Sequence, residues 1–449
     1  MLERLFQLTS NNTTVRREVL AGTTTFLTMS YIVFVNPGIL SAAGMNFGAV
    51  FTATCLAAAL GTLLMGFLAN YPIALAPLMG QNAFFSTVVL AGVAGTRVSW
   101  EVALAAVFFS GVLFLILTLV RIREMIIDAV PRSLKHAIAS GIGLFIMVVG
   151  LVNSGIVLRR GPEDPSLVPV QLGDLSSAPA LLALGGTLLT AALLVRRVRG
   201  AILIGLVATS LAGGMAGYIT FGEVLSLPPS LEPTFLQMDI RGALTWSMLP
   251  VVLIFLYMAV FDAIGTLVGI ADRAGFLTPE GKLPRATRAL FADAAATMAG
   301  AVLGTSTTGA YIESSAGVQE GGRTGLANVI TGCLFLMTLF FSPLAAAVAA
   351  PIEVDGRMFS PFTAPALILV GCLMAQGMGR IQWDDLTDAI PAFLVVVLIP
   401  FTWSIADGIA AGFMAYPVLK IVSGRASEAS WLVRILGLLF LARYLFLPT

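Results

Sequence analysis

The 449-residue chain has very few of the residues that build metal sites and disulfides. It contains one histidine, His136, and three cysteines, Cys55, Cys333 and Cys372, which lie in apolar runs without C-x-x-C spacing. A single histidine cannot form a histidine-rich metal cluster, and these cysteines predict neither a zinc site nor a disulfide framework. We therefore expect no metal and no bound cofactor.

Charge is equally scarce. Charged residues make up 11% of the chain, against about 25% in soluble domains. Hydrophobic residues reach 58% and the mean hydropathy is +0.95, so most of the surface must face lipid. These values predict an all-α polytopic membrane protein. With 25 basic and 24 acidic residues the net charge is only +1, which excludes the basic field that nucleic-acid binding needs.

Apolar runs between polar breaks indicate the membrane spans. A helix of about 20 residues crosses the hydrocarbon core. Fourteen such runs are found, with thirteen to fifteen compatible with the sequence: 19–40, 51–69, 73–91, 101–120, 136–153, 180–195 and 201–221, then 248–270, 287–303, 307–321, 326–350, 361–376, 388–403 and 405–422. A last apolar stretch, 431–447, carries Arg434 and Arg443 and is predicted to lie along the membrane interface.

The distribution of basic residues predicts the orientation. With a cytoplasmic N-terminus, 20 of the 25 basic residues fall on the cytoplasmic side, as the positive-inside rule expects. Both termini are then cytoplasmic in a plasma (inner) membrane protein. Seven spans precede residue 222 and seven follow residue 247. Because seven is odd, two halves with one fold must be inverted relative to each other, a common transporter plan.

Two spans in matching positions are unsuited to continuous helix. The stretch Tyr71–Ser86 contains Pro77, and Gly304–Gly317 is rich in glycine and threonine, which favour extended backbone. Either span alone is equally well explained as a kinked packing helix. Interrupted spans in matching positions of two halves, however, point to the binding site of a transporter.

Four acidic residues lie well inside predicted spans, where charge is costly and usually functional. Asp293 is near Arg285 and Arg288, so we expect it to pair with a basic residue or to cap a helix. Asp407 lies between Ser404 and Gly408, where a turn joining two spans explains it as well as a function does.

Asp262 and Glu313 differ because no basic residue lies in either apolar run. Carboxyl groups without a cationic partner favour the neutral form, so they can take up and release protons. Thr266, four residues after Asp262, shares its helix face. A single offset of 231 residues relates Tyr31 to Asp262 and Asn82 to Glu313, with weak sequence identity along it.

Five motifs together carry a family resemblance: Ala76-Pro77-Leu-Met-Gly80-Gln-Asn82-Ala-Phe-Phe85, Phe261-Asp262-Ala-Ile-Gly265-Thr266-Leu-Val-Gly269, Gly304-Thr-Ser-Thr-Thr308 with Tyr311-Ile-Glu313-Ser-Ser-Ala-Gly317, Gly321-Gly-Arg323-Thr-Gly325, and Phe26-Leu-Thr-Met-Ser-Tyr-Ile-Val-Phe-Val-Asn36-Pro37. The chain resembles the nucleobase–cation symporter-2 superfamily over nearly its whole length, and within it the AzgA-like purine permeases. Leu78 and Gln81 depart from the family's wording, which has glycine and leucine there.

The resemblance implies fourteen spans in a seven-plus-seven inverted repeat, with short extended segments in spans 3 and 10. It further implies a discontinuous core (transport) domain, 16–121 and 248–350, and a discontinuous gate domain, 134–221 and 361–423. The stretch 431–447 would be an added C-terminal helix.

The resemblance also implies proton symport of a purine base (hypoxanthine, guanine or adenine) by alternating access. Asn82, Asp262 and Glu313 match the family's functional positions, with Asp262 and Glu313 as proton-coupling groups and protons as the coupling ion. Backbone groups at Ala83–Phe84 and Tyr311–Ile312 would bind the base edge, beside Thr266. Phe84 or Phe85 could stack on the ring, although core packing explains either one more simply. The sequence leaves open whether the protein forms a homodimer.

Other functions are weighed against this one. A xanthine or uracil symporter, an anion exchanger of similar architecture, and a channel stay open as alternatives. A channel more often places rings of charge or carbonyls on an open pore. An enzyme would need a nucleophile–base pair or a metal cluster, which one histidine and scattered acids do not supply, so we expect no enzymatic activity.

Overall fold

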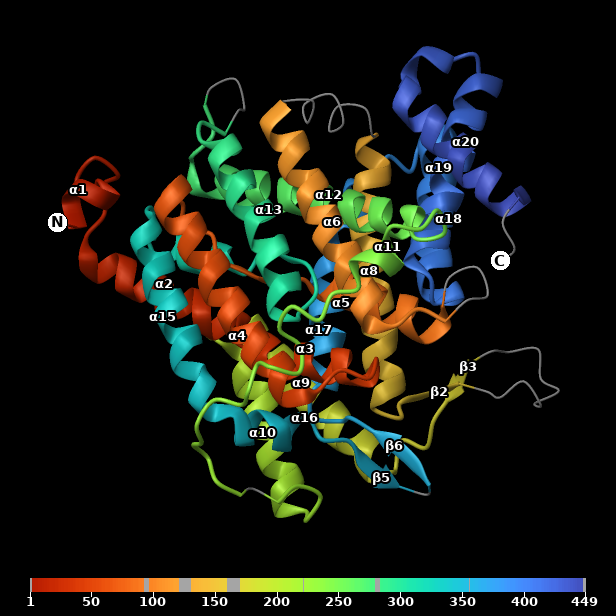
Figure 1. Cartoon of the computed structure of the whole chain (residues 1–449). Coiled ribbons are helices and arrows are strands. Elements are labelled where there is room, and N and C mark those ends of the chain that lie inside the picture. Colours follow the sequence, from red (N-terminus) through yellow and green to blue (C-terminus); the bar gives the residue numbers. More distant parts are fainter. Residues whose placement is uncertain are drawn as a thin grey trace.

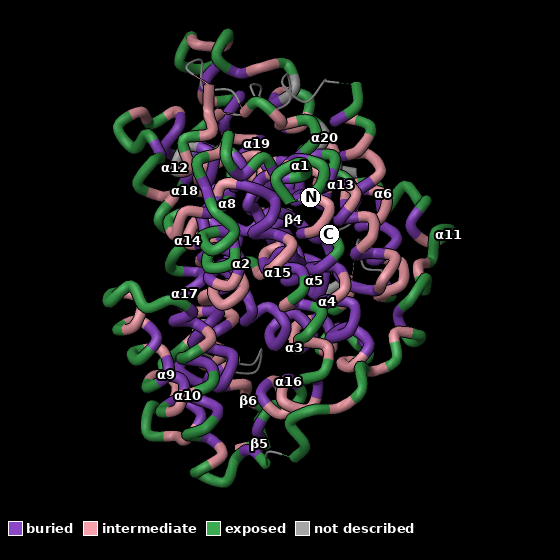
Figure 2. Tube along the Cα trace, turned by 90° about the vertical axis from the view of Figure 1, so that its left-hand side faces the viewer, coloured by how far each residue is buried: buried purple, intermediate pink, exposed green. Residues whose placement is uncertain are grey.

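The computed structural model describes residues 2–92, 97–120, 131–159, 170–220, 222–278, 283–354 and 356–446. The domain limits expected at residues 121 and 447 lie outside these ranges. Figure 1 shows a bundle of helices. Among the described residues there are also three small antiparallel strand pairs. Figure 2 shows that buried segments run through its centre, around β4, with exposed segments at the periphery.

The first half of the chain forms the helices α1 (Leu2–Phe6), α2 (Val15–Met29), α3 (Ile32–Ala42), α4 (Phe47–Leu64), α5 (Met79–Ala91), α6 (Trp100–Val120), α8 (Arg132–Asn153), α9 (Ala178–Val195) and α10 (Ala201–Met215). The second half forms α11 (Ile240–Ala243), α12 (Leu249–Ala274), α13 (Ala286–Leu303), α14 (Ser314–Gln319), α15 (Gly325–Thr338), α16 (Ser342–Ala349), α17 (Ala364–Ala375), α18 (Leu386–Thr402), α19 (Ile405–Val422) and α20 (Trp431–Phe446).

Polar caps set several helix starts. Asn46 accepts a hydrogen bond from the backbone N–H of Ala49 (3.0 Å) at the start of α4. Ser404 does the same for Asp407 (3.2 Å) in α19. Such caps satisfy N–H groups that have no partner inside the helix, so these breaks between apolar runs become helix boundaries.

A mostly helical membrane-type fold is confirmed. Seven helical stretches among the described residues are long and apolar enough to cross a membrane: Val15–Ala42, Phe47–Ala69, Trp100–Val120, Arg132–Asn153, Ala178–Val195, Leu249–Ala271 and Gly325–Ala349. Several other predicted spans appear as shorter apolar helices; α17, for example, has 12 residues, about 18 Å at 1.5 Å per residue. Fourteen spans in an inverted repeat therefore stay a prediction.

Both interrupted stretches contain a strand, as predicted. β1 (Leu75–Pro77) and β4 (Thr308–Ala310) pair antiparallel, with Leu75 opposite Ala310 and Pro77 opposite Thr308. Both strands are fully buried. We call the two strands, with the start of α5 and the segment from Tyr311 to α14, the crossing.

Side chains of neighbouring helices satisfy the backbone groups that the crossing leaves without helical partners. Thr62 of α4 accepts from the N–H of Leu75 and donates to its carbonyl, both at 2.9 Å. The Asn328 amide of α15 donates to the carbonyl of Ile73 at 2.8 Å. Irregular backbone at membrane depth is tolerated where protein supplies such partners, which explains how the chain can break two spans here.

Two hairpins mark one end of the bundle. β2 (Val157–Arg159) pairs with β3 (Val170–Leu172), and β5 (Ile352–Val354) pairs with β6 (Arg357–Phe359). Both hairpins lie at the bottom of Figure 1, and we call this the hairpin end. The C-terminal ends of α8 and α16 lead into them.

The predicted C-terminal apolar stretch is helical. α20 packs along α19, because Arg434 donates to the carbonyl of Ala426 near one end and Tyr444 donates to Asp407 near the other. The Phe413 and Phe440 rings, 6.2 Å apart, lie between these contacts. The two helices are therefore antiparallel neighbours. The predicted position of α20 along a membrane interface stays a prediction.

Candidate functional site

Asn82 joins the two interrupted spans. It lies in the first turn of α5 and is fully buried. The Ser306 hydroxyl, just before β4, donates to Asn82 Oδ1, while Asn82 Nδ2 has only the distant Met79 sulfur, at 3.9 Å, as a partner. Sulfur is a weak acceptor, so Asn82 keeps donor capacity for another polar group.

Glu313 lies at the other side of the crossing, at the start of α14. The fully buried Tyr31 donates from its hydroxyl to Glu313 Oε1 at 2.9 Å. Tyr311, two residues before Glu313, donates from its hydroxyl to the Pro77 carbonyl at 2.5 Å. This bond connects β1 to the segment that carries Glu313. The carboxylate keeps further acceptor positions, since it can accept about four hydrogen bonds.

Asp262 and Thr266 lie on α12, which packs against both β4 and α14. Asp262 is half-buried and interacts electrostatically with Glu313 and with Asp293. Within the described parts of the chain, no ion pair reaches any of these three carboxyl groups. Three acidic side chains therefore lie at or beside the crossing without a cationic partner among the described residues.

Asp293 is the residue that the sequence interpretation missed. We expected it to pair with Arg285 or Arg288 or to cap a helix. Instead it lies two turns into α13, a helix that packs against β4, and it is 1% exposed. Its Oδ1 has no partner among the described residues.

The expected basic partners of Asp293 lie elsewhere. Arg285 places its guanidinium 4.4 Å from the centre of the Tyr71 ring, and Arg288 is exposed. The sequence does contain one indication that Asp293 does not pair with Arg285. Asp293 lies eight residues further along the same span, which places it about 12 Å away along a helix.

A cavity of about 1030 Å³ opens beside the crossing, toward the hairpin end. Met79, Ala83 and Phe84 of α5 line one side of it. Asn82, Asp262 and Glu313 do not line it; Asn82 is fully buried behind this wall. The predicted site residues thus form two groups, a polar one inside the crossing and an apolar one on the cavity.

The aromatic candidates have packing roles. Phe84 packs edge to face against Phe255 of α12, with ring centres 4.8 Å apart, while still lining the cavity. Phe85 is fully buried and does not line the cavity. Ile312 is 42% exposed, whereas Tyr311 is buried. Only Phe84 of the two phenylalanines is placed to touch a molecule in the cavity.

Gln81 and Asp407 differ in whether their side-chain polar atoms have hydrogen-bond partners. Gln81 is 2% exposed, and neither amide atom has a partner within the described chain. Asp407 follows the cap residue Ser404 in the first turn of α19, at the junction of α18 and α19. Asp407 also accepts a hydrogen bond from Tyr444 and lines the cavity.

Comparison with known proteins agrees with this architecture. The model of the permease family Xan_ur_permease matches residues 16–437. A putative permease of Methanocaldococcus jannaschii, MJ0326, is 48% identical over 99% of this chain and 98% of its own length. The adenine permease AdeP of Escherichia coli is 44% identical over 100% of this chain and 96% of its own length. The guanine/hypoxanthine permease PbuG of Bacillus subtilis is 44% identical over 99% of this chain and 100% of its own length.

Solved structures resemble the fold alone. The transmembrane domain of the cyanobacterial bicarbonate transporter BicA superposes with a TM-score of 0.58 at 16% identity, covering 88% of this chain and 96% of that one. SLC26A9 gives a TM-score of 0.61 at 12% identity, covering 91% of this chain and 66% of that one.

Fold and comparisons together define a class: a multi-pass membrane permease, hence a transporter and not an enzyme. More narrowly, the chain belongs to the Xan_ur_permease family within the nucleobase–cation symporter-2 superfamily, and its relatives include adenine and guanine/hypoxanthine permeases. The resemblance of the sequence motifs is thereby confirmed.

Proposed function

We propose that this protein imports a purine base, hypoxanthine, guanine or adenine, together with protons. The observation that carries the proposal is the crossing: an amide and three carboxyl groups, which have no cationic partner among the described residues, lie at or beside buried, irregular backbone. The names of the relatives AdeP and PbuG support the substrate class.

The base would bind between the two strands of the crossing. A neutral purine carries N–H donors and ring-nitrogen acceptors on its edges. Glu313 would accept ring N–H bonds, while Asn82 would offer both a donor and an acceptor. Backbone groups at Ala83–Phe84 and Ile312 would complete the edge contacts, with the Phe84 ring beside the plane of the base.

Asp262 and Glu313 would couple transport to protons. A carboxyl group that is buried without a cation favours the neutral form, so reorganisation of the site changes how strongly it holds its proton. Thr266, one turn after Asp262 on α12 and buried, would hydrogen-bond this carboxyl group or the base. Asp293 would contribute to the same electrostatic balance. The coupling ion is the proton in this proposal, and no cofactor takes part.

The proposed transport cycle is a rocking motion of two domains. The core would comprise 16–121 and 248–350 and the gate 134–221 and 361–423, within fourteen spans arranged as a seven-plus-seven inverted repeat. Packing supports this division: α2 and α4 pack on α15, whereas α8 packs on α17 and α18. Arg199, between α9 and α10, bridges the two domains by an ion pair with Glu320 after α14 (2.6 Å).

Uptake by proteoliposomes tests the proposal. Wild-type protein should accumulate labelled hypoxanthine when an inward proton gradient is imposed, and an uncoupler should abolish the accumulation. Asp262→Asn and Glu313→Gln should each reduce uptake at least 100-fold, because each removes a proton-carrying group. Glu232→Gln, an exposed acid far from the crossing in sequence, serves as the matched control. Uptake at the wild-type rate in either site variant would refute the mechanism.

Competition experiments separate the neighbouring functions. Adenine, guanine, xanthine and uracil are added in excess to labelled hypoxanthine, and inhibition by the purines alone is expected. Anion exchange, the activity that the names of the bicarbonate transporter BicA and of the anion transporter SLC26A9 indicate for those proteins, is disfavoured because no cation of the described residues pairs with the acids at the crossing to attract an anion. Uptake of bicarbonate or chloride in place of purine would favour the exchanger.

A further inference from the structure

The cavity has a second wall that the proposed site does not use. This wall is built from α8 and from the junction of α18 and α19, which also line the cavity. Of the described residues that line the cavity, Asp407 is the one with a formally charged side chain at neutral pH. A single acid in an otherwise neutral cavity of about 1030 Å³ sets the electrostatic preference of the whole space.

Asp407 is held in place by local structure. Ser404 caps α19 by accepting from the Asp407 N–H, which fixes the carboxyl group in the first helical turn. A negative group is favoured at this position by the helix dipole. Tyr444 donates to Oδ1, but a carboxylate accepts about four hydrogen bonds, so acceptor capacity remains on the cavity side.

An aromatic pair accompanies Asp407 on this wall. Trp403 packs edge to face against Phe145 of α8, with ring centres 5.6 Å apart and an interplanar angle of 82°. Both rings line the cavity. Trp403 has a φ of 55°, a left-handed conformation that is costly for a residue with a side chain and is enriched at ligand-binding sites. The wall thus presents a flat aromatic surface four residues from a hydrogen-bond acceptor.

We propose that Trp403 and Asp407 form a second binding site for the nucleobase, which holds it in the cavity before it reaches the crossing. The proposal rests on the proposed function, from which it takes the substrate class. The base lies against the Trp403 ring, and a ring or amino N–H donates to the Asp407 carboxylate. Neutral planar N–H donors fit this wall, whereas anions are repelled by the carboxylate.

Asp407 could instead serve only to anchor α20 through Tyr444, and two variants separate these roles. Asp407→Asn should raise the KM for hypoxanthine about tenfold with little change in kcat, the size expected for one charge-assisted hydrogen bond. Asp407→Glu should restore most of the affinity. Tyr444→Phe removes the anchoring bond but leaves the carboxylate, so KM should stay at the wild-type value.

Two results in this series overturn the proposal. If Tyr444→Phe raises KM as much as Asp407→Asn does, Asp407 acts by anchoring α20. If Asp407→Asn lowers kcat and leaves KM unchanged, it acts on the conformational change. Wild-type protein that transports no purine at all would instead refute the proposed function, so the two failures are distinguishable.

Equilibrium binding gives an independent measurement. In protein carrying Glu313→Gln, where the site at the crossing is impaired, labelled hypoxanthine should still bind with reduced affinity. Adding Asp407→Asn or Trp403→Ala to this background should abolish the remaining binding. Residual binding that neither substitution weakens, or none in the Glu313→Gln protein, contradicts a second site.

Discussion

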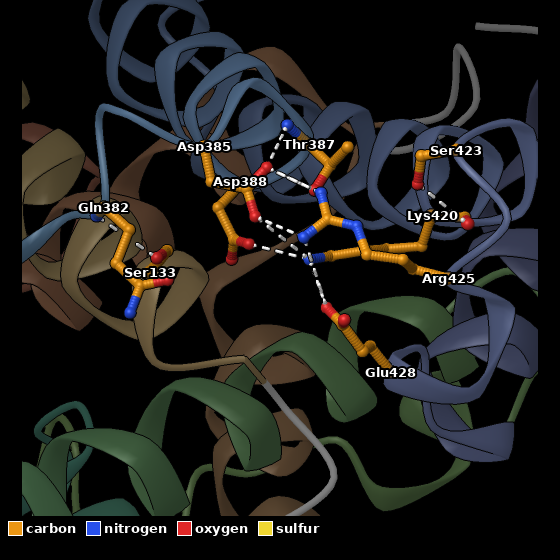
Figure 3. A network of polar contacts seen from close by, with 9 residues as sticks. All are labelled: Ser133, Gln382, Asp385, Thr387, Asp388, Lys420, Ser423, Arg425 and Glu428. Atoms are coloured by element: carbon orange, nitrogen blue, oxygen red, sulfur yellow. Dashed lines mark hydrogen bonds and ion pairs between the residues drawn. The ribbon is translucent and has the colours of Figure 1, made fainter.

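Two regions of this protein bury acidic side chains in opposite ways. At the crossing, Asp262, Asp293 and Glu313 meet without a cation among the described residues. In the other region, shown in Figure 3, acidic and basic side chains form ion pairs with one another. These residues are Asp385 and Asp388 at the start of α18, Lys420 of α19, and Arg425 and Glu428, which follow α19. We call these five residues the ion-pair cluster.

In the ion-pair cluster every acid contacts a cation. The fully buried Lys420 ammonium contacts Asp388 at 2.8 Å and Glu428 at 2.6 Å. Arg425 donates two bonds of 2.8 Å to Asp385, and this guanidinium, with help from Thr387, holds the pKa of Asp385 below its ordinary value. Such an arrangement is suited to holding α18 against α19.

The comparison indicates what distinguishes a structural acid from a functional one. Both regions bury carboxyl groups, so burial alone does not separate them. The difference is the compensation: paired acids keep a fixed charge, whereas unpaired acids can exchange protons. Substitutions should therefore cost stability in the ion-pair cluster and transport at the crossing.

The largest expected loss of stability comes from the ion-pair cluster. Lys420→Met leaves Asp388 buried without its cation and should lower the free energy of unfolding by about 3 kcal/mol. Thermal unfolding in detergent, followed by intrinsic fluorescence, measures the change. Lys420→Arg keeps the charge and should lose much less, and Glu313→Gln should leave the unfolding midpoint unchanged. An unfolding midpoint that falls more for Glu313→Gln than for Lys420→Met would reverse the comparison.

Glu18 sharpens the comparison because it is buried without a cationic partner among the described residues, and its carboxylate nevertheless accepts hydrogen bonds. Its carboxylate accepts from the backbone N–H groups of Arg323 (2.9 Å), Thr324 (3.4 Å) and Ala327 (3.2 Å) at the start of α15. Glu18→Ala leaves these donors without partners and should lower the unfolding free energy by about 2 kcal/mol.

The same Glu18→Ala protein should keep the wild-type KM for hypoxanthine, since Glu18 joins two helices and reaches no ligand. Glu18→Gln keeps an acceptor oxygen and should be intermediate in stability. Uptake kinetics and thermal unfolding are measured on the same preparations. A loss of proton-driven uptake in Glu18→Gln with unchanged unfolding would move Glu18 into the functional group of acids.

How far the sequence predicts this site depends on the range of each interaction. Pro77 and the run Gly304–Gly309 predict both strands, because backbone propensity acts locally. The absence of nearby basic residues likewise singles out Asp262 and Glu313. The bond between Ser306 and Asn82 joins residues 224 positions apart and depends on the antiparallel pairing of β1 with β4.

Other features depend on tertiary packing that no local pattern encodes. Asp293 faces β4 because of the rotation of α13 about its own axis, which its sequence neighbours Arg285 and Arg288 do not indicate. The offset of 231 residues relates Tyr31 to Asp262, whereas in the structure Tyr31 donates to Glu313, 282 positions away. The cavity wall at Trp403 and Asp407 likewise forms only when α8 meets the junction of α18 and α19.

The smallest energetic effect is expected at the exposed ion pair between Arg199 and Glu320, whose side chains are 52% and 22% exposed. Solvent screening limits such a pair to about 0.5 kcal/mol, so Arg199→Ala should hardly change the unfolding midpoint. The pair nevertheless joins the proposed gate and core at a point away from the cavity, and breaking it should favour the state in which the cavity is closed.

Labelling of a cavity residue measures this shift. Val149 lines the cavity, and Val149→Cys is introduced in a background without the native cysteines. Adding Arg199→Ala should make this cysteine react about twofold more slowly with a polar thiol reagent. A change of about 0.5 kcal/mol alters the ratio of two conformational states by that factor. Arg241→Ala, at an exposed arginine, is the control. The exchange Arg199→Glu with Glu320→Arg should restore the rate, since it recreates the pair with reversed polarity. Equal rates in all four proteins would mean that the ion pair does not distinguish the two states, and the proposed rocking would then need a different contact to balance it.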